Sequence, residues 1–300
     1  MNILLTGATG FLGKAIFDVL NENHQLSTLS RNIADYQICL ETEIPVFFTP
    51  FELVVHCAGK AHSVPKTDFE KKQFYDVNVT GTINLLEGLK KSGLPNQFIF
   101  ISSVSVYGQE IGSSINENHS LDAKDAYGLS KIKAEKVVLD WCEENKVICT
   151  ILRLPLLIGK NPPGNLGTMI KAINKGYYFN IDGGKAKKSM VLAKDVASFI
   201  TIVAPVGGIY NLTDGIHPDF FQLSLAISNR KTFSLPLSLA KLIGKIGDVF
   251  GDNFPVTSLK IKKITSELTF DDTKARELLN WRPEEVLVYL MREKYLNKID

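Results

Sequence analysis

The chain has 300 residues, 45% of them hydrophobic and 22% charged, which is typical of a globular protein with a substantial core. Its 34 basic and 32 acidic residues leave a net charge of +2, so no overall field predicts nucleic acid or a membrane as a partner, and any basic site must be local. The cysteines and histidines lack the spacing of a zinc site, and no apolar run reaches the roughly 18 residues of a membrane span, so we expect a cytoplasmic protein with free thiols and no metal.

The first predicted unit is a strand, a glycine turn and a helix. Ile3–Leu5 form the apolar strand, and apolar residues then recur with helical spacing from Leu12 to Leu20. The turn between them contains Gly7, Gly10 and Gly13, and glycines together with a helix N-terminus favour a bound pyrophosphate. The spacing is not the usual Gly-x-Gly-x-x-Gly, so an ordinary strand–helix turn is the alternative.

The second predicted strand, Gln25–Ser30, ends where a dinucleotide fold meets the adenosine ribose. A carboxylate there binds the 2′-hydroxyl of NAD, whereas an arginine accommodates the 2′-phosphate of NADP. This chain has no acid at that point and has Arg31, which favours NADP over NAD, although NAD stays possible. The alternative is that Arg31 is a solvated loop residue.

Strands and helices alternate through the next hundred residues. Glu52–Cys57 is a buried strand, a helix capped by Thr67 or Asp68 runs to about Ser92, and Phe98–Ser102 is another buried strand. This alternation predicts an α/β protein with a doubly wound, Rossmann-type parallel sheet whose ligands bind at the carboxyl ends of the strands.

Tyr127 and Lys131 are four residues apart and therefore lie on one face of a predicted helix. An ammonium near a phenol lowers the phenol pKa from its usual value of about 10, which makes an acid or base that works near neutral pH. As an isolated pair these two residues would be read as exposed helix positions.

Together the motifs resemble an extended short-chain dehydrogenase/reductase of the nucleotide-sugar epimerase/dehydratase kind. The resemblance covers most of the chain and rests on TGATGFLG, HCAG, VNVTGT, SSVSVYG and YGLSK, followed by ILRLP, KSMV with DVA, and DDTKAR with LNWRP.

The resemblance implies a catalytic trio of Ser103, Tyr127 and Lys131. Ser103 would bind the sugar oxygen, Tyr127 would pass the proton, and Lys131 would hold the nicotinamide ribose. It also implies a nucleotide-diphosphate-sugar substrate and a homodimer. The predicted cofactor-binding residues are Gly7, Thr9, Gly10, Phe11, Leu12, Gly13, Ser30, Arg31, Asn32, Cys57, Ala58, Gly59, Asn78, Tyr127, Lys131, Leu154 and Pro155. The predicted substrate-binding residues are Lys60, His62, Ser103, Ser105, Tyr127 and Lys188.

Residues 1–154 and 190–214 are predicted to form the dinucleotide-binding domain, and residues 155–189 and 215–300 a smaller α/β substrate lobe. In related enzymes a basic residue near Lys188 clamps the diphosphate, although a solvated charged loop is the alternative. Leu235–Phe250 is an amphipathic helix whose apolar face we expect in the core, a partner surface being the alternative.

Three functions remain open. The first is an NADP(H)-dependent reductase acting at C4 of a UDP-linked 4-keto-6-deoxy-hexosamine in surface-polysaccharide biosynthesis. The second is a UDP-hexose 4-epimerase for UDP-glucose or UDP-N-acetylglucosamine, and the third is an NADP-sensing protein without turnover. A dehydratase is disfavoured because Val104 and Ser105 stand where the family's dehydratases carry an acidic pair.

Overall fold

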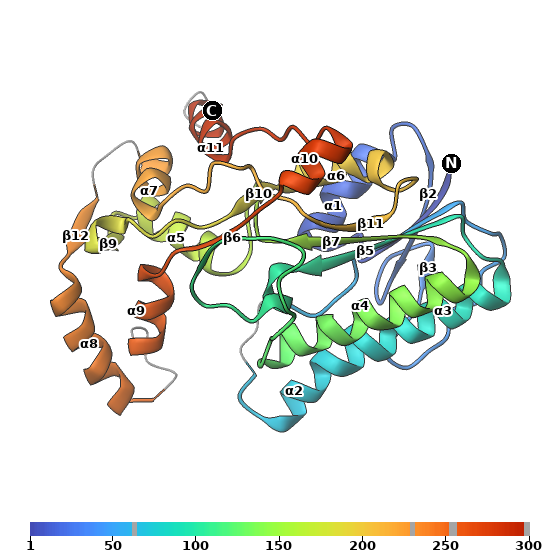
Figure 1. Ribbon diagram of the computed structural model, residues 1–300, viewed down its shortest axis with the longest axis horizontal. Helices are drawn as coiled ribbons and strands as arrows, with labels where there is room; N and C mark the ends of the chain where they lie inside the picture. The colour runs from blue at the N-terminus through green and yellow to red at the C-terminus, as the bar shows by residue number, and fades with distance from the viewer. Residues whose placement is uncertain (62–64, 229–231, 252–256, 297–300) are drawn as a thin grey trace.

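A seven-stranded parallel sheet forms the centre of the computed structural model, which describes residues 1–61, 65–228, 232–251 and 257–296 (Figure 1). The strand order is β11-β7-β5-β4-β1-β2-β3. This order and the parallel pairing confirm the doubly wound α/β fold. The strands are β1 (Asn2–Thr6), β2 (Gln25–Ser30), β3 (Tyr36–Gln37), β4 (Leu53–His56), β5 (Gln97–Ser103), β7 (Ile148–Leu154) and β11 (Gly208–Asn211).

Helices cover both faces of this sheet, and each face has its own apolar core. On one face lie α1 (Phe11–Leu20), α6 (Ala193–Val203) and α10 (Thr273–Leu279), with Trp281 packed edge-on against Phe199 at 4.7 Å between ring centroids. On the other face lie α3 (Gly81–Ser92) and α4 (Ala126–Asn145). Because both faces are covered, the central strands are apolar at consecutive positions and not at alternate ones.

The predicted helix that ends near Ser92 is interrupted by a π-helix. Thr67 caps α2 (Asp68–Tyr75) through a capping box with Glu70, the π-helix Asp76–Thr80 follows, and α3 then runs to Ser92. The cap was predicted but the π-helix was not, because one extra residue in a turn barely disturbs the apolar pattern.

Shorter elements lie beside the large sheet. A separate apolar core lies among α5 (Gly164–Asn174), α7 (Phe220–Ser228) and α11 (Val286–Leu296). Three parallel strand pairs join segments that are distant in sequence: β8 (Leu156–Ile158) with β10 (Met190–Leu192), β9 (Phe179–Ile181) with β12 (Phe233–Leu235), and β6 (Gly112–Ile115) with β13 (Leu268–Phe270).

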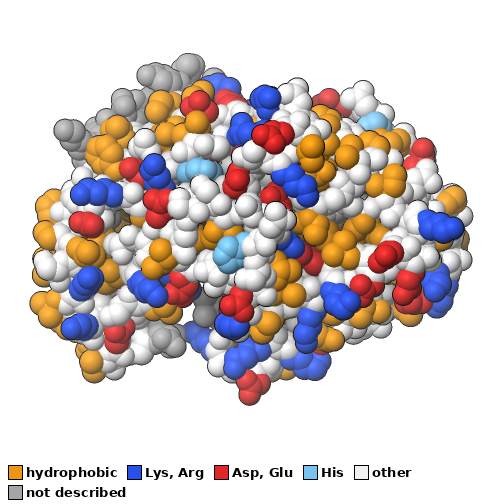
Figure 2. Space-filling view, in the orientation of Figure 1, with side chains coloured by type: hydrophobic (Ala, Val, Ile, Leu, Met, Phe, Trp, Pro, Cys, Tyr) orange, Lys and Arg blue, Asp and Glu red, His pale blue; other side chains and the backbone are white. Residues whose placement is uncertain are grey.

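Helices α8 (Leu237–Val249) and α9 (Ser258–Thr265) pack together at one end of the molecule, on the left in Figure 1. The expectation that the apolar face of Leu235–Phe250 lies in the core holds only in part. Leu235, Leu237 and Ala240 pack with Ile181 and Ile261, and Gly244 is buried because α9 approaches so closely that a Cβ on it would lie 3.0 Å from the Ser258 nitrogen. Leu239, Leu242, Ile246 and Val249 are exposed, and Figure 2 shows hydrophobic side chains along this edge.

Candidate functional site

The predicted site segments follow the carboxyl ends of neighbouring parallel strands. In the sheet, Thr6 lies beside His56, His56 beside Phe100, and Ser103 beside Leu154. The glycine turn, the segment after His56, Ser103 and the residues around Leu154 are therefore brought to one edge of the sheet. This is the edge at which doubly wound proteins bind their ligands.

The glycine turn has the geometry of a pyrophosphate cradle. Gly7 has a φ of +73°, and a Cβ there would lie 2.7 Å from the backbone nitrogen of Ala58. A Cβ on Gly13 would overlap the carbonyl oxygen of Gly7. Gly10 is the N-cap of helix α1 and offers no side-chain cap, which leaves the first amides of the helix available to an anion. The residues present therefore fit a dinucleotide.

In the loop after β2, the Arg31 guanidinium lies beside the Glu41 carboxylate. The sequence pattern did not predict this partner. The Arg31 side chain is 66% exposed, and its Nη1 lies 3.3 Å from Oε1 of Glu41. The other nearby acid, Asp35, accepts hydrogen bonds from the amide and hydroxyl of Thr28, each at 2.7 Å, and these bonds lower its pKa. The Asp35 carboxylate therefore binds Thr28 of β2.

A buried hydrogen-bond chain fixes the segment after β4. The Ala58 amide donates to Thr6 Oγ1 at 3.1 Å, Thr6 Oγ1 lies 2.7 Å from His56 Nδ1, and His56 Nε2 lies 2.9 Å from Thr82 Oγ1. Because the Thr82 hydroxyl donates to the Asn78 carbonyl, His56 must donate from Nε2 and accept at Nδ1. Burial lowers the His56 pKa to about 3, so this imidazole is neutral and its role is structural.

Tyr127 and Ser103 are brought together at the start of α4. Asp125 caps the helix by accepting from the Gly128 amide at 3.0 Å. Ser103 lies close enough to Tyr127 to affect its pKa, and the Ser103 hydroxyl donates to that of Ser105 at 3.1 Å. Burial raises the Tyr127 pKa more than the Ser103 hydroxyl lowers it. The phenol is therefore protonated at neutral pH.

Lys131 is buried one turn after Tyr127, but its ammonium is directed to the sheet. Its Nζ donates to the Ile101 carbonyl at 2.7 Å and lies 3.8 Å from the centroid of the Phe100 ring. Burial lowers the Lys131 pKa to about 8. The structure thus differs from the expectation that Lys131 lowers the Tyr127 pKa, because burial dominates the pKa of both groups.

Asn78, in the π-helix, connects α4 to the segment after β4. Its Nδ2 donates to Ser130 Oγ at 2.9 Å and to the Lys60 carbonyl at 3.0 Å, and its Oδ1 accepts from the Lys60 amide at 2.7 Å. The Lys60 side chain is turned to α2, where Nζ donates to Gln73 Oε1 at 3.0 Å. A π-helix at such a point is common in functional sites.

The other predicted substrate residues are more dispersed. Lys188 is half-buried just before β10, its amide donates to the Pro218 carbonyl, and burial lowers the pKa of its side chain. His62 lies outside the described residues.

A buried ionic network beneath the site was not predicted. Ser102 donates to Glu135, whose carboxylate pairs with Arg153 at 2.7 Å. Arg153 also donates to the Tyr107 hydroxyl at 3.1 Å, which in turn donates to Asn211 Oδ1 at 2.8 Å. The spacing of four residues between Lys131 and Glu135 could have indicated this network in the sequence, because it places a second charged residue on the same face of the helix.

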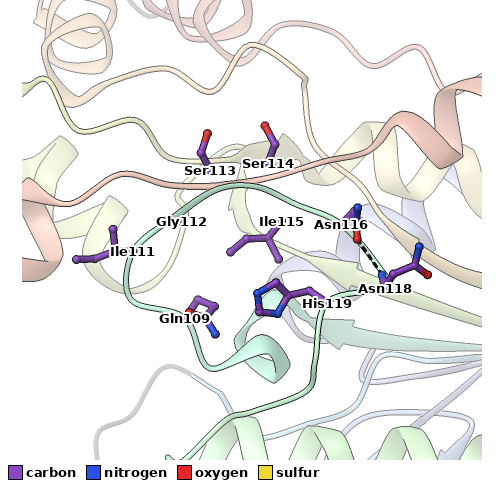
Figure 3. A pocket seen from close by; sticks show the side chains of 9 residues that line it. All are labelled: Gln109, Ile111, Gly112, Ser113, Ser114, Ile115, Asn116, Asn118 and His119. Carbon is purple, nitrogen blue, oxygen red and sulfur yellow. Dashed lines mark hydrogen bonds between the residues drawn. The ribbon is translucent and has the colours of Figure 1, made fainter.

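Two cavities lie beside the strand pair β6–β13, and neither is lined by Ser103, Tyr127 or Lys131. One of about 350 Å³ is lined by nine residues between Gln109 and His119, and Figure 3 shows Gln109 and His119 around it together with the bond from the Asn118 amide to Asn116. A second of about 360 Å³ is lined by residues that include His217 and Arg276. The described part of the chain holds no cluster of metal ligands and no helix long and apolar enough to cross a bilayer.

Comparison with known proteins decides the family, because residues 3–212 match the NAD dependent epimerase/dehydratase family. The chain belongs to this family. It is 29% identical, over 91% of its own length and 88% of the relative's, to N-acetyl-alpha-D-glucosaminyl-diphospho-ditrans,octacis-undecaprenol 4-epimerase of Escherichia coli O157:H7. It is 31% identical to GDP-6-deoxy-D-mannose reductase of Pseudomonas aeruginosa, over 46% of each chain.

The fold agrees with this assignment. The structure of UDP-N-acetylglucosamine 4-epimerase from Bacillus cereus matches 99% of both chains with a TM-score of 0.77 and 21% identity. The protein is thus an NAD(P)-dependent enzyme of the extended short-chain dehydrogenase/reductase type, within a family of nucleotide-sugar epimerases and reductases.

Proposed function

We propose that the protein is an NADP(H)-dependent reductase acting at C4 of a UDP-linked 4-keto-6-deoxy-hexosamine in surface-polysaccharide biosynthesis. The observation that carries the proposal is Arg31, which stands after β2 where NAD enzymes carry a carboxylate. The ion pair with Glu41 does not oppose it, because an exposed pair contributes only about 0–1 kcal/mol and exchanges readily for a phosphate.

Ser103, Tyr127 and Lys131 have different roles in the proposed reaction at C4. When bound, the reduced nicotinamide supplies a hydride to the C4 carbonyl carbon. Ser103 donates a hydrogen bond to the ketone oxygen and orients it, and Tyr127 gives its phenolic proton to that oxygen as negative charge develops there. The O–H bond of Tyr127 breaks and an O–H bond forms on the sugar. Lys131 would stabilise the resulting phenolate and bind the nicotinamide ribose after its Nζ turns away from the Ile101 carbonyl. The raised pKa of Tyr127 suits this role, because the phenol enters each cycle protonated.

The substrate lobe supplies charge for the diphosphate. We assign this role to Lys188, whose pKa is lowered by burial and would recover when a diphosphate lies against it. Lys60, His62 and Ser105 are proposed to contact the sugar. A lysine offers a point charge without the two-pronged geometry of arginine, so binding should tolerate small changes in diphosphate position.

A 4-epimerase is the second candidate, and it is favoured by the relative from Escherichia coli that matches nearly the full chain. The same trio would first remove hydride from C4 and then return it to the opposite face from a cofactor that stays bound. Since that relative is named for a sugar on undecaprenyl diphosphate, both UDP-linked and polyprenyl-linked sugars are substrates to test. An NADP-sensing protein is disfavoured by the complete trio.

The experiment that separates these functions begins with the cofactor. Purified protein is desalted and heat-denatured, and the supernatant is analysed for dinucleotides. The reductase should carry no stoichiometric dinucleotide and should oxidise NADPH on addition of UDP-4-keto-6-deoxy-N-acetylglucosamine. Stoichiometric NAD that survives desalting, with interconversion of UDP-N-acetylglucosamine and its C4 epimer, would overturn the reductase in favour of the epimerase.

A further inference from the structure

The second cavity, of about 360 Å³, lies where the loop after β11 meets the start of α10. Its lining includes Asp272 and Arg276, residues 215–217 of the loop, and Ser114. The trio does not line it, so the proposed reaction leaves this cavity without a role. One water takes up only about 30 Å³, and the cavity therefore has room for a small molecule.

An incomplete ion pair borders this cavity. Arg276 Nε donates to Asp272 Oδ1 at 2.8 Å, and the Asp272 side chain is only 7% exposed. A guanidinium and a carboxylate often form two parallel bonds, but here the second atoms of the pair, Asp272 Oδ2 and Arg276 Nη2, are buried and have no hydrogen-bond partner among the described residues. Buried polar atoms without partners are unfavourable, because they have lost their bonds to water. A group from outside the chain that bridges these two atoms would remove this cost.

The backbone of the loop makes room for this guanidinium. Gly215 has a φ of +76°, and a Cβ there would lie 2.4 Å from Arg276 Nη2, so a larger residue would displace the arginine. The two other acids of the lining, Asp214 and Asp271, already accept hydrogen bonds from backbone amides. Among the three acids that line the cavity, a buried oxygen without a partner occurs only on Asp272.

The chemistry of these atoms selects the kind of ligand. A group that bridges them must accept from Arg276 Nη2 and donate to Asp272 Oδ2, and a hydroxyl does both. An anion fits less well, because the lining has three acids against one arginine, and burial lowers the pKa of His217, which is therefore neutral. Ile216, which is 46% exposed, adds an apolar surface for the C–H face of a ring.

We infer that this cavity binds a neutral sugar, one hydroxyl of which bridges Asp272 and Arg276. The inference does not depend on which reaction the trio performs. The cavity also adjoins the segment that carries Lys188, since the Lys188 amide donates to the carbonyl of Pro218, directly after the lining residue His217, at 3.2 Å. A sugar in the cavity would therefore lie against the loop that holds this segment in place.

Titration of the isotope-labelled whole protein with the methyl glycosides of glucose and N-acetylglucosamine tests this inference. The Gly215 amide resonance should shift and reach saturation with at least one of them. Asp272→Asn removes the charge of the acceptor and should weaken binding roughly 10-fold. Ser114 is exposed, and Figure 3 shows its side chain turned away from His119. Because Ser114 lines the cavity, Ser114→Phe should fill it and abolish binding.

Matched controls carry the same changes on other surfaces. Asp140→Asn alters an exposed ion pair with Lys136 on α4, and Ser120→Phe places a ring on an exposed loop, so both variants should bind the glycosides like the wild type. Absence of a saturable shift at Gly215 overturns the inference, as does binding that Asp272→Asn and Ser114→Phe leave unchanged. Inorganic phosphate is the probe for an anion site. If phosphate shifts the Gly215 resonance and neither glycoside does, the inference is also wrong.

Discussion

Glu135 follows Lys131 by one turn of α4, and the two side chains bind consecutive residues of β5. Lys131 Nζ donates to the Ile101 carbonyl, and the Glu135 carboxylate accepts from the Ser102 hydroxyl. Helix α4 is therefore held to the sheet by a buried cation and a buried anion side by side. Burial lowers the Lys131 pKa, and the negative charge of Glu135 only partly offsets this effect.

The first prediction concerns stability against pH. The Lys131 pKa is about 8 in the folded protein and 10.5 in the reference state, so between pH 8 and 9 the folded state loses a proton that the unfolded state keeps. Because the unfolded state then binds more protons, the free energy of unfolding should rise with pH by about 1 kcal/mol over that unit. Lys131→Met should remove this rise, as measured by urea unfolding at pH 8 and pH 9. Equal slopes in the two proteins would show that Lys131 titrates normally.

The ion pair between Glu135 and Arg153 should be costly to break from one side. Arg153→Met leaves the Glu135 carboxylate buried without its cation, and we expect a loss of about 3–5 kcal/mol in the free energy of unfolding. Adding Glu135→Leu should restore much of that loss, because no unpaired charge then remains. Chemical denaturation of the two single variants and the double variant measures both effects. If the stability losses of the two single variants simply added in the double variant, this explanation would be contradicted.

Tyr127→Phe should separate chemistry from binding. Without the phenolic proton, kcat for reduction of the 4-keto sugar should fall by roughly 10²–10⁴-fold. Dinucleotide affinity should stay close to that of the wild type, since the glycine turn and the Ala58 segment are untouched. Stopped-flow measurement of NADPH oxidation, with a parallel fluorescence titration of NADPH, provides both numbers. Unchanged turnover would remove Tyr127 from the mechanism.

Arg31→Ala tests cofactor choice. Loss of a charge-assisted contact to the 2′-phosphate, worth about 1.5–3 kcal/mol, should weaken NADPH binding roughly 10-fold or more and leave NADH binding unchanged. Glu41→Ala is the matched variant, because it releases Arg31 from its ion pair and should strengthen NADPH binding by a few-fold at most. Calorimetric titration with the two dinucleotides distinguishes these results. If Arg31→Ala weakened the binding of NADPH and NADH equally, Arg31 would have no role in the choice of cofactor.

Local sequence signals predicted the parts of the structure that depend on local chemistry. The glycine turn, the strand Gln25–Ser30 and the cap at Thr67 follow from turn and capping preferences over a few residues. The pairing of Ser103 with Tyr127 came from the resemblance, since those residues are distant in sequence. The structure brings them together because parallel strands end at one edge.

What could not be predicted depends on contacts between distant segments. The partner of Arg31 is Glu41, in an irregular segment without periodicity, and the network around Arg153 joins residues from four parts of the chain. The exposure of Leu239, Leu242, Ile246 and Val249 on α8 was not predicted, because the periodicity of a helix does not show which of its faces a distant segment covers. The close approach of α9 at Gly244 determines the buried face.

The return of the chain from β13 onward has a consequence for synthesis on the ribosome. Thr269 Oγ1 accepts from the Ser114 amide, Asn211 Nδ2 donates to the Asp271 carbonyl, and Trp281 covers the core beside Phe199. The nascent seven-stranded sheet therefore emerges with one flank uncovered, and its core is completed only when the residues up to Trp281 have been made. Contacts of such long sequence separation form late, so this flank is the surface that a chaperone would have to shield until translation reaches that point.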